Sequence, residues 1–320
     1  MECGNLLRRS VCLLIFSGVV GLLSSLLLSP WALGAACCAA GSSSRNLMTE
    51  FNRWEFRLSH RFSTVVAEQF GQGPVLFWDD ERQLQEHLLT PSVSFFIAPD
   101  WQGGVSWDLV SRQAAFVGGG SESSGLAPGD LNLFLAYEWL YPSPPQVWQP
   151  QVFLSYTQGL PTGRGLYQSQ SPGVTDVTGG EQWTSRLGVH LFKSLYRFRY
   201  SLESHWGWSW PQSAGELQLL SRQELALTLG LLRLTAGERS WSYGVSWTAL
   251  FKEGRGLGEG REPQRAPAEL VYELSPYILW TPEGDWTVTM SYGDQSIFGP
   301  VRNSQLSRRV SLAISRALPI

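Results

Sequence analysis

Charged side chains are scarce in this 320-residue sequence, and this shortage limits the functions open to it. Only 16% of the residues are charged and the formal net charge is -3, whereas ordinary soluble domains are about 25% charged. Lysine occurs twice, at Lys193 and Lys252, and the arginines are spread along the chain instead of forming one basic cluster. Because no segment could follow a phosphate backbone, nucleic acid is not expected as a partner.

Cysteine and histidine are also rare, with four residues of each. The cysteines have no zinc-ligand spacing, and Cys3 and Cys12 lie in the N-terminal segment, so no disulfide framework and no metal site is predicted. The sequence has no phosphate-cradling glycine loop and no nucleophile elbow, and no histidine has serine two residues later, as in outer-membrane phospholipases. No cofactor, no catalytic residue and no enzymatic activity is therefore predicted.

Long hydrophobic runs are absent except for one at the N-terminus. Arg8 and Arg9 precede an apolar run at 11–28, and Pro30 and the small residues of 32–36 follow it. This order predicts a cleaved signal peptide over 1–36 and Sec-type export; an uncleaved anchor helix is the alternative. Residues 37–50 are predicted to form a flexible stub, and Cys37 is a candidate for lipidation.

The rest of the chain shows a period of two instead of long apolar runs. Trp54, Phe56 and Leu58 alternate with Glu55 and Arg57, and only a β-strand places such residues on opposite faces. Similar stripes occur at 131–141, 196–208, 225–231, 241–248, 270–280, 286–292 and 310–314, with weaker candidates at 92–98, 104–117, 147–157 and 182–192. About twelve strands are therefore predicted.

The links between these strands alternate in length. Long links are expected at 64–91, 118–130, 158–181, 252–268 and 293–305, and most of the others are short. Bacterial outer-membrane barrels have this pattern, with long extracellular loops and short periplasmic turns. The apolar faces also carry many Trp and Tyr side chains, which a closed interior could not easily hold and which fit better against lipid. We predict an all-β fold, a transmembrane antiparallel up-and-down barrel over 51–320.

The polar faces would then point into the barrel. One interpretation is an electrostatic lining that selects solutes; the other is an Arg–Glu ladder that fills and stiffens a narrow interior. Because both signs occur, often on one strand, the ladder is favoured. The predicted pore-lining residues are Arg53, Glu55, Arg57, Arg61, Glu138, Arg186, Arg197, Arg199, Glu203, Arg222, Glu224, Glu273 and Arg309.

Two of the long links carry further predictions. Residues 79–89 have a helical composition and are expected to form a short surface helix, with a plug across the barrel mouth as the alternative. The Gly-, Arg- and Glu-rich segment 254–262 is expected to be an exposed mobile loop.

Two short motifs resemble a known group of proteins. The segment 152–163, a strand followed by Leu-Pro-Thr-Gly, is similar to a stretch of outer-membrane proteins grouped as transporters of the MetA pathway of phenol degradation. The Cys37-Cys38 pair before Gly41 and three serines is similar to their mature N-termini. The resemblance implies a barrel that passes small, aromatic or hydrophobic solutes. The sequence departs from this class at Ile320, where such barrels usually carry an aromatic residue.

The sequence therefore predicts an outer-membrane channel or transporter for small solutes. Its expected partners are the lipid bilayer and the barrel-assembly machinery. A non-conducting structural or adhesive barrel is the first alternative, and a barrel-embedded lipid hydrolase is the second.

Overall fold

The computed structural model describes most of the chain from residue 47 onward. The described ranges are 47–48, 54–69, 74–78, 83–116, 120–140, 149–171, 175–214, 217–234, 240–254, 256–259, 262–282, 285–297 and 302–318. The predicted signal peptide and Cys37 lie outside them, as does most of the predicted stub.

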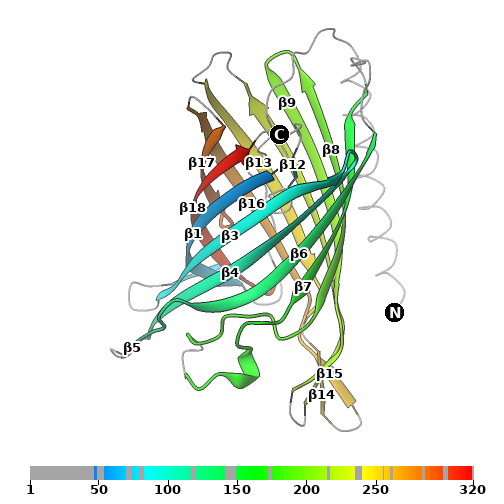
Figure 1. Cartoon of the computed structure of the whole chain (residues 1–320). Helices are drawn as coiled ribbons and strands as arrows, with labels where there is room; N and C mark the ends of the chain where they lie inside the picture. The colour runs from blue at the N-terminus through cyan, green and yellow to red at the C-terminus, as the bar shows by residue number, and fades with distance from the viewer. Residues whose placement is uncertain are drawn as a thin grey trace, which may run out of the picture.

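Twelve long strands form one antiparallel sheet that closes on itself (Figure 1). Each pairs with its neighbours in chain order, and the last strand pairs with the first along nearly its whole length. The prediction of about twelve strands is confirmed. The strands are β1 (Trp54–Gln69), β3 (Gln83–Ala98), β4 (Trp101–Phe116), β6 (Ala127–Leu140), β7 (Gln151–Leu160), β8 (Thr184–Leu195), β9 (Phe198–Ser209), β12 (Arg222–Arg233), β13 (Ser240–Lys252), β16 (Glu269–Thr281), β17 (Trp286–Asp294) and β18 (Ser304–Leu318).

The links differ between the two ends of the barrel, here called the turn end and the loop end. Two-residue turns at 99–100 and 196–197 lie at the turn end, where Trp54 begins the first strand and Leu318 ends the last. The loop-end links carry structure of their own. These elements are β2 (Leu76–Phe77), β5 (Gly120–Ser123), η1 (Leu166–Gln168), β10 (Gln212–Ala214), β11 (Leu217–Leu219), β14 (Gly256–Glu259) and β15 (Glu262–Arg265).

Three predictions about these links were wrong. Strand β1 continues to Gln69 and β3 begins at Gln83, so the first link is much shorter than 64–91. Residues 84–89 pair with β1 on one side and β4 on the other instead of forming a helix, because the sheet satisfies their backbone groups and overrides local helix propensity. Residues 79–82 of the predicted helix lie outside the described residues. Most of 254–262 belongs to the β14–β15 hairpin, which joins β10 and β11 in a small four-stranded sheet.

The outer surface of the barrel is apolar, as the alternation predicted. Trp54, Phe56 and Leu58 are 42–49% exposed, and corresponding side chains are exposed on the other strands. At the turn end, Arg316 lies over the ring of Trp286 and Arg233 over that of Tyr243, the arrangement expected of side chains at a membrane interface. An apolar band bounded in this way is what a barrel in lipid requires. Among the described residues, no helix is long and apolar enough to cross a membrane.

Candidate functional site

The inward-facing side chains follow from the strand register. Directly opposed residues in antiparallel strands share a face, and Trp206 and Leu225, which are exposed on the outside, fix the orientation of β9 and β12. One inward row crosses six neighbouring strands, and a second crosses the same strands nearer the loop end. The first row is Phe153, His190, Glu203, Thr228, Thr248 and Glu273, and the second is Thr157, Arg186, Gly207, Glu224, Lys252 and Glu269.

Two ion pairs in the interior each join strands that are not neighbours. Arg186 on β8 donates to Glu224 on β12, although β9 lies between them. The intervening residue is Gly207, where a Cβ would lie only 2.7 Å from Cγ of Glu224 and 3.1 Å from Cγ of Arg186. The missing side chain of this glycine provides the space for the ion pair.

The second pair repeats this arrangement on β16, β17 and β18. Arg309 on β18 donates from Nη1 to Oε2 of Glu273 on β16 at 2.8 Å. Gly293 of β17 lies opposite Arg309, and a Cβ there would lie 2.8 Å from a carboxylate oxygen of Glu273. Both pairs connect strands through the interior in addition to the backbone ladder.

A third carboxylate, which was not predicted, holds two arginines. Glu86 on β3 accepts from Arg112 on β4, with 2.9 Å between Nη2 and Oε2, and lies 3.5 Å from Nη2 of Arg61 on β1. The helical composition of 79–89 concealed Glu86 as an inward-facing residue. Arg61, one of the predicted pore-lining residues, thus has a carboxylate beside it.

The remaining predicted residues take different places. Glu55, Arg57 and Arg222 lie on the inward face of their strands and are half-buried. Glu138 accepts a hydrogen bond of 2.6 Å from Gln151. Arg199 is buried near the turn end and donates to Ser194. Arg53 lies outside the described residues.

Arg197 requires a correction. It lies exposed in the turn between β8 and β9, outside the barrel wall, so its side chain does not belong to the inward set. The sequence suggested otherwise because the alternation of β9 continues through 196–197, whereas Tyr196 takes a positive φ of 58° that ends the strand.

The turn-end half of the interior is packed with apolar side chains. Phe153 is fully buried and meets Phe192 edge-to-face, with Phe134 and Ala136 beside them. Leu47, from the segment before β1, belongs to the same cluster. The chain therefore enters its own barrel before the first strand begins.

Gln102 holds this entering segment by its backbone. Its side-chain amide donates to the carbonyl of Met48 at 2.5 Å, and its side-chain oxygen accepts from the amide of Met48 at 2.8 Å. Gln102 is 1% exposed, and Met48 and Leu47 are also buried. By pairing with both the amide and the carbonyl of Met48, the Gln102 side chain bonds to this segment as the backbone of a neighbouring strand would. Leu47 and Met48 fill the interior here, and no sequence pattern indicated it.

A half-buried serine lies together with a buried histidine and a buried glutamate beside this cluster. Oγ of Ser155 is 2.8 Å from Nε2 of His190, and Nδ1 of His190 is 3.7 Å from Oε2 of Glu203. His190 and Glu203 are each 1% exposed, and fully buried Phe153 lies opposite His190. The order of groups is that of a catalytic triad, but it is enclosed in the packed part of the interior.

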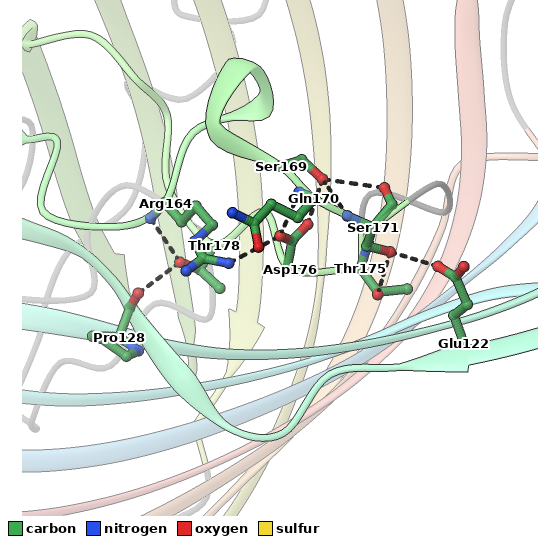
Figure 2. Close-up of polar contacts among 9 residues, drawn as sticks. All are labelled: Glu122, Pro128, Arg164, Ser169, Gln170, Ser171, Thr175, Asp176 and Thr178. Carbon is green, nitrogen blue, oxygen red and sulfur yellow. Dashed lines mark hydrogen bonds and ion pairs between the residues drawn. The ribbon is translucent and has the colours of Figure 1, made fainter.

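The loop-end link between β7 and β8 is held by a network of polar contacts (Figure 2). Asp176 accepts from the backbone amide of Gln170 at 2.9 Å, from the hydroxyl of Ser169, and from Arg164 at 3.0 Å. These donors, the Gln170 amide first, stabilise the carboxylate and hold the pKa of Asp176 well below its usual range.

The same link is fastened to its neighbours in the barrel. The Thr178 hydroxyl donates to the carbonyl of Pro128 on β6 at 2.6 Å, and the Ser171 hydroxyl donates to Glu122 on β5 (Figure 2). Asp130 of β6 accepts from the backbone amides of Gly163 and Gly180 near the two ends of the link. These contacts fix the link against the β5–β6 side of the loop end.

No group of three or more metal-ligating side chains occurs among the residues that the structure describes.

No family model matches this sequence. A search of curated proteins also finds no match. Among solved structures, an outer membrane channel from Pseudomonas putida F1 matches with a TM-score of 0.62 and 12% identity over 88% of this chain and 100% of that one. This likeness supports the fold.

Two other barrels match less well. The NanC porin gives a TM-score of 0.45 at 9% identity, covering 83% of this chain and 100% of that one. The β domain of the Bordetella autotransporter BrkA gives 0.47 at 10% identity, covering 82% and 99%. Neither value supports an argument about function.

Proposed function

We propose that this chain is an outer-membrane channel for small solutes whose interior is closed by Leu47 and Met48. The pairing of Gln102 with the backbone of Met48 supports this most directly. A barrel built only to span the membrane has no need to draw a separate segment of chain into its interior. Met48 is held by only two hydrogen bonds and Leu47 by a small apolar contact. Replacing these contacts by water costs little free energy, so the segment can leave the interior.

The location and the solute are parts of the same proposal. The apolar outer surface and the predicted N-terminal signal peptide favour the outer membrane after Sec-type export. The resemblance to barrels of the MetA pathway adds that the solutes are small and aromatic or hydrophobic. The inward Arg and Glu residues then act both as ion pairs that stiffen the wall and as the polar lining that a solute passes.

Conductance in planar lipid bilayers tests the closure. We expect small or infrequent currents from the refolded chain and larger or more frequent ones from Gln102→Ala, because that variant loses both bonds to Met48. Gln85→Ala, which alters a half-buried glutamine on β3 that has no contact with Met48, serves as the control and should match the unaltered protein. If Gln102→Ala folds, as heat-modifiable gel migration would show, but never conducts, the chain is a structural or adhesive barrel instead.

A further inference from the structure

A cavity of about 330 Å³ lies in the loop-end half of the interior, away from the apolar cluster around Leu47. Its existence follows from the uneven lengths of the strands. β17 ends at Asp294, opposite Leu274, so it does not reach the level of Glu269 on β16. Gln295 and Asn303, which follow β17, line the cavity at that level instead. The lining includes Leu250, Lys252, Glu269, Val271, Gln295 and Arg309.

Lys252 brings a cation to this cavity. Its neighbours in the register are Glu224 on one side and Glu269 on the other. Glu224 is held by Arg186, and no carboxylate of a described residue lies within ion-pair distance of the Lys252 ammonium. Glu224 and Glu269 attract the Lys252 charge from beyond that distance, and Arg222 and Arg186 repel it. An inward ammonium beside empty space is a binding group for an anion.

The Arg309 and Gln295 side chains that line the cavity are held in position by other residues. Arg309 donates Nε to Ser307 at 3.0 Å and Nη1 to Glu273 at 2.8 Å. Among the described residues Nη2 has no bonded acceptor. Gln295 donates to Glu273 and accepts from both the amide and the hydroxyl of Ser307. Groups held in this way lose little freedom when a ligand binds.

We infer that this cavity is a binding site for a small organic monocarboxylate. The carboxylate binds Lys252 with Nη2 of Arg309, and the apolar part of the molecule contacts Leu250 and Val271. The carboxylate of Glu269 in the same wall disfavours a second negative charge on the ligand. The volume lies at the small end of ligand pockets, which limits the ligand to few heavy atoms.

The inference deepens the proposed function, because a site at the loop end would be the first stop for a solute entering the barrel. It needs no open passage, however, so binding can be measured separately from conductance. The probe is sodium benzoate, with benzyl alcohol as its uncharged counterpart, titrated calorimetrically into the refolded full chain in detergent. Benzoate is expected to bind and benzyl alcohol to bind at least about tenfold more weakly.

The two lysines of the chain provide a matched pair of variants. Lys252→Gln should weaken benzoate binding about tenfold or more, and Lys252→Arg should retain it. Lys193→Gln removes a cation that donates to the backbone carbonyl of Gln149 away from the cavity, and should bind as the unaltered chain does.

Equal binding of benzoate and benzyl alcohol, or unchanged binding in Lys252→Gln, would overturn the site even if the barrel conducts. Binding that depends on Lys252 in a barrel that never conducts would keep the site and remove the channel function.

Discussion

Arg309 on β18 donates to Glu273 on β16 across Gly293 of the strand between them, at 2.8 Å. This pair, together with Arg186 and Glu224, fastens strands that the backbone ladder does not connect directly. The interior of the barrel is therefore braced by side chains, and the bracing depends on glycines in the intervening strands.

Removing one partner of such a pair leaves the other charge half-buried. We expect Glu273→Gln to lower the free energy of unfolding by about 1–3 kcal/mol, because Arg309 loses its carboxylate. Guanidinium unfolding in lipid vesicles measures this. The double variant Glu273→Gln/Arg309→Gln should lose less than the sum of the single changes. Strict additivity would mean that the two residues do not interact. As the control, the variant Arg197→Gln, which alters an exposed residue in a turn, should change the free energy of unfolding by no more than about 0.5 kcal/mol.

Gly207, which lies between Arg186 and Glu224, should matter for the stability of the barrel as much as the two charges do. Gly207→Val would place carbon atoms where both side chains pass, so we expect the ion pair to separate and the barrel to unfold at lower denaturant. Gly125→Val is the matched control, because a Cβ there meets nothing within 4 Å. If both variants unfold at the same denaturant concentration as the unaltered chain, the space above Gly207 is not required.

The lipid-facing assignment predicts a cost that depends on depth. Leu229 is exposed near the middle of β12, whereas Tyr196 lies in a turn and is 72% exposed. We expect Leu229→Arg to destabilise the barrel in vesicles by about 2–4 kcal/mol and Tyr196→Arg by about 0–1 kcal/mol. A barrel whose outer surface faced water would show nearly equal effects.

Acid should loosen the link between β7 and β8. Because the pKa of Asp176 is lowered in the folded link, its stabilising contacts are fully present above the usual aspartate pKa of about 3.9. They are lost as the pH falls from there toward the folded pKa. Hydrogen exchange across 164–178, corrected for the intrinsic pH dependence, should rise over that window. Asp176→Asn should show faster exchange already at neutral pH. Equal protection of the unaltered chain above and below that window would contradict this role of Asp176.

Ser155, with the buried His190 and Glu203 behind it, allows a direct test of the hydrolase alternative. We expect a fluorophosphonate probe to leave Ser155 unlabelled, because its histidine and glutamate are enclosed beside Phe153. Labelling of the native barrel that disappears in Ser155→Ala would show an activated nucleophile and favour the hydrolase.

The amino-acid sequence by itself determined the strands, their approximate number and the orientation of their faces. Period-two alternation is a local property, and the position of Trp54 relative to Glu55 assigns both faces of β1 without knowledge of any partner. Most of the inward charges were found in the same way. Glu86 was missed because a segment of helical composition became a strand only when β1 and β4 paired with it.

Only the tertiary structure decided which inward residues meet. Arg186 reaches Glu224, and Arg309 reaches Glu273, because the register between neighbouring strands places a glycine beneath each pair, and the register depends on the whole closed sheet. The entry of Leu47 and Met48 into the barrel, and the isolation of Lys252 beside a cavity, likewise depend on distances between segments far apart in the chain. Alternation carries no information about such distances.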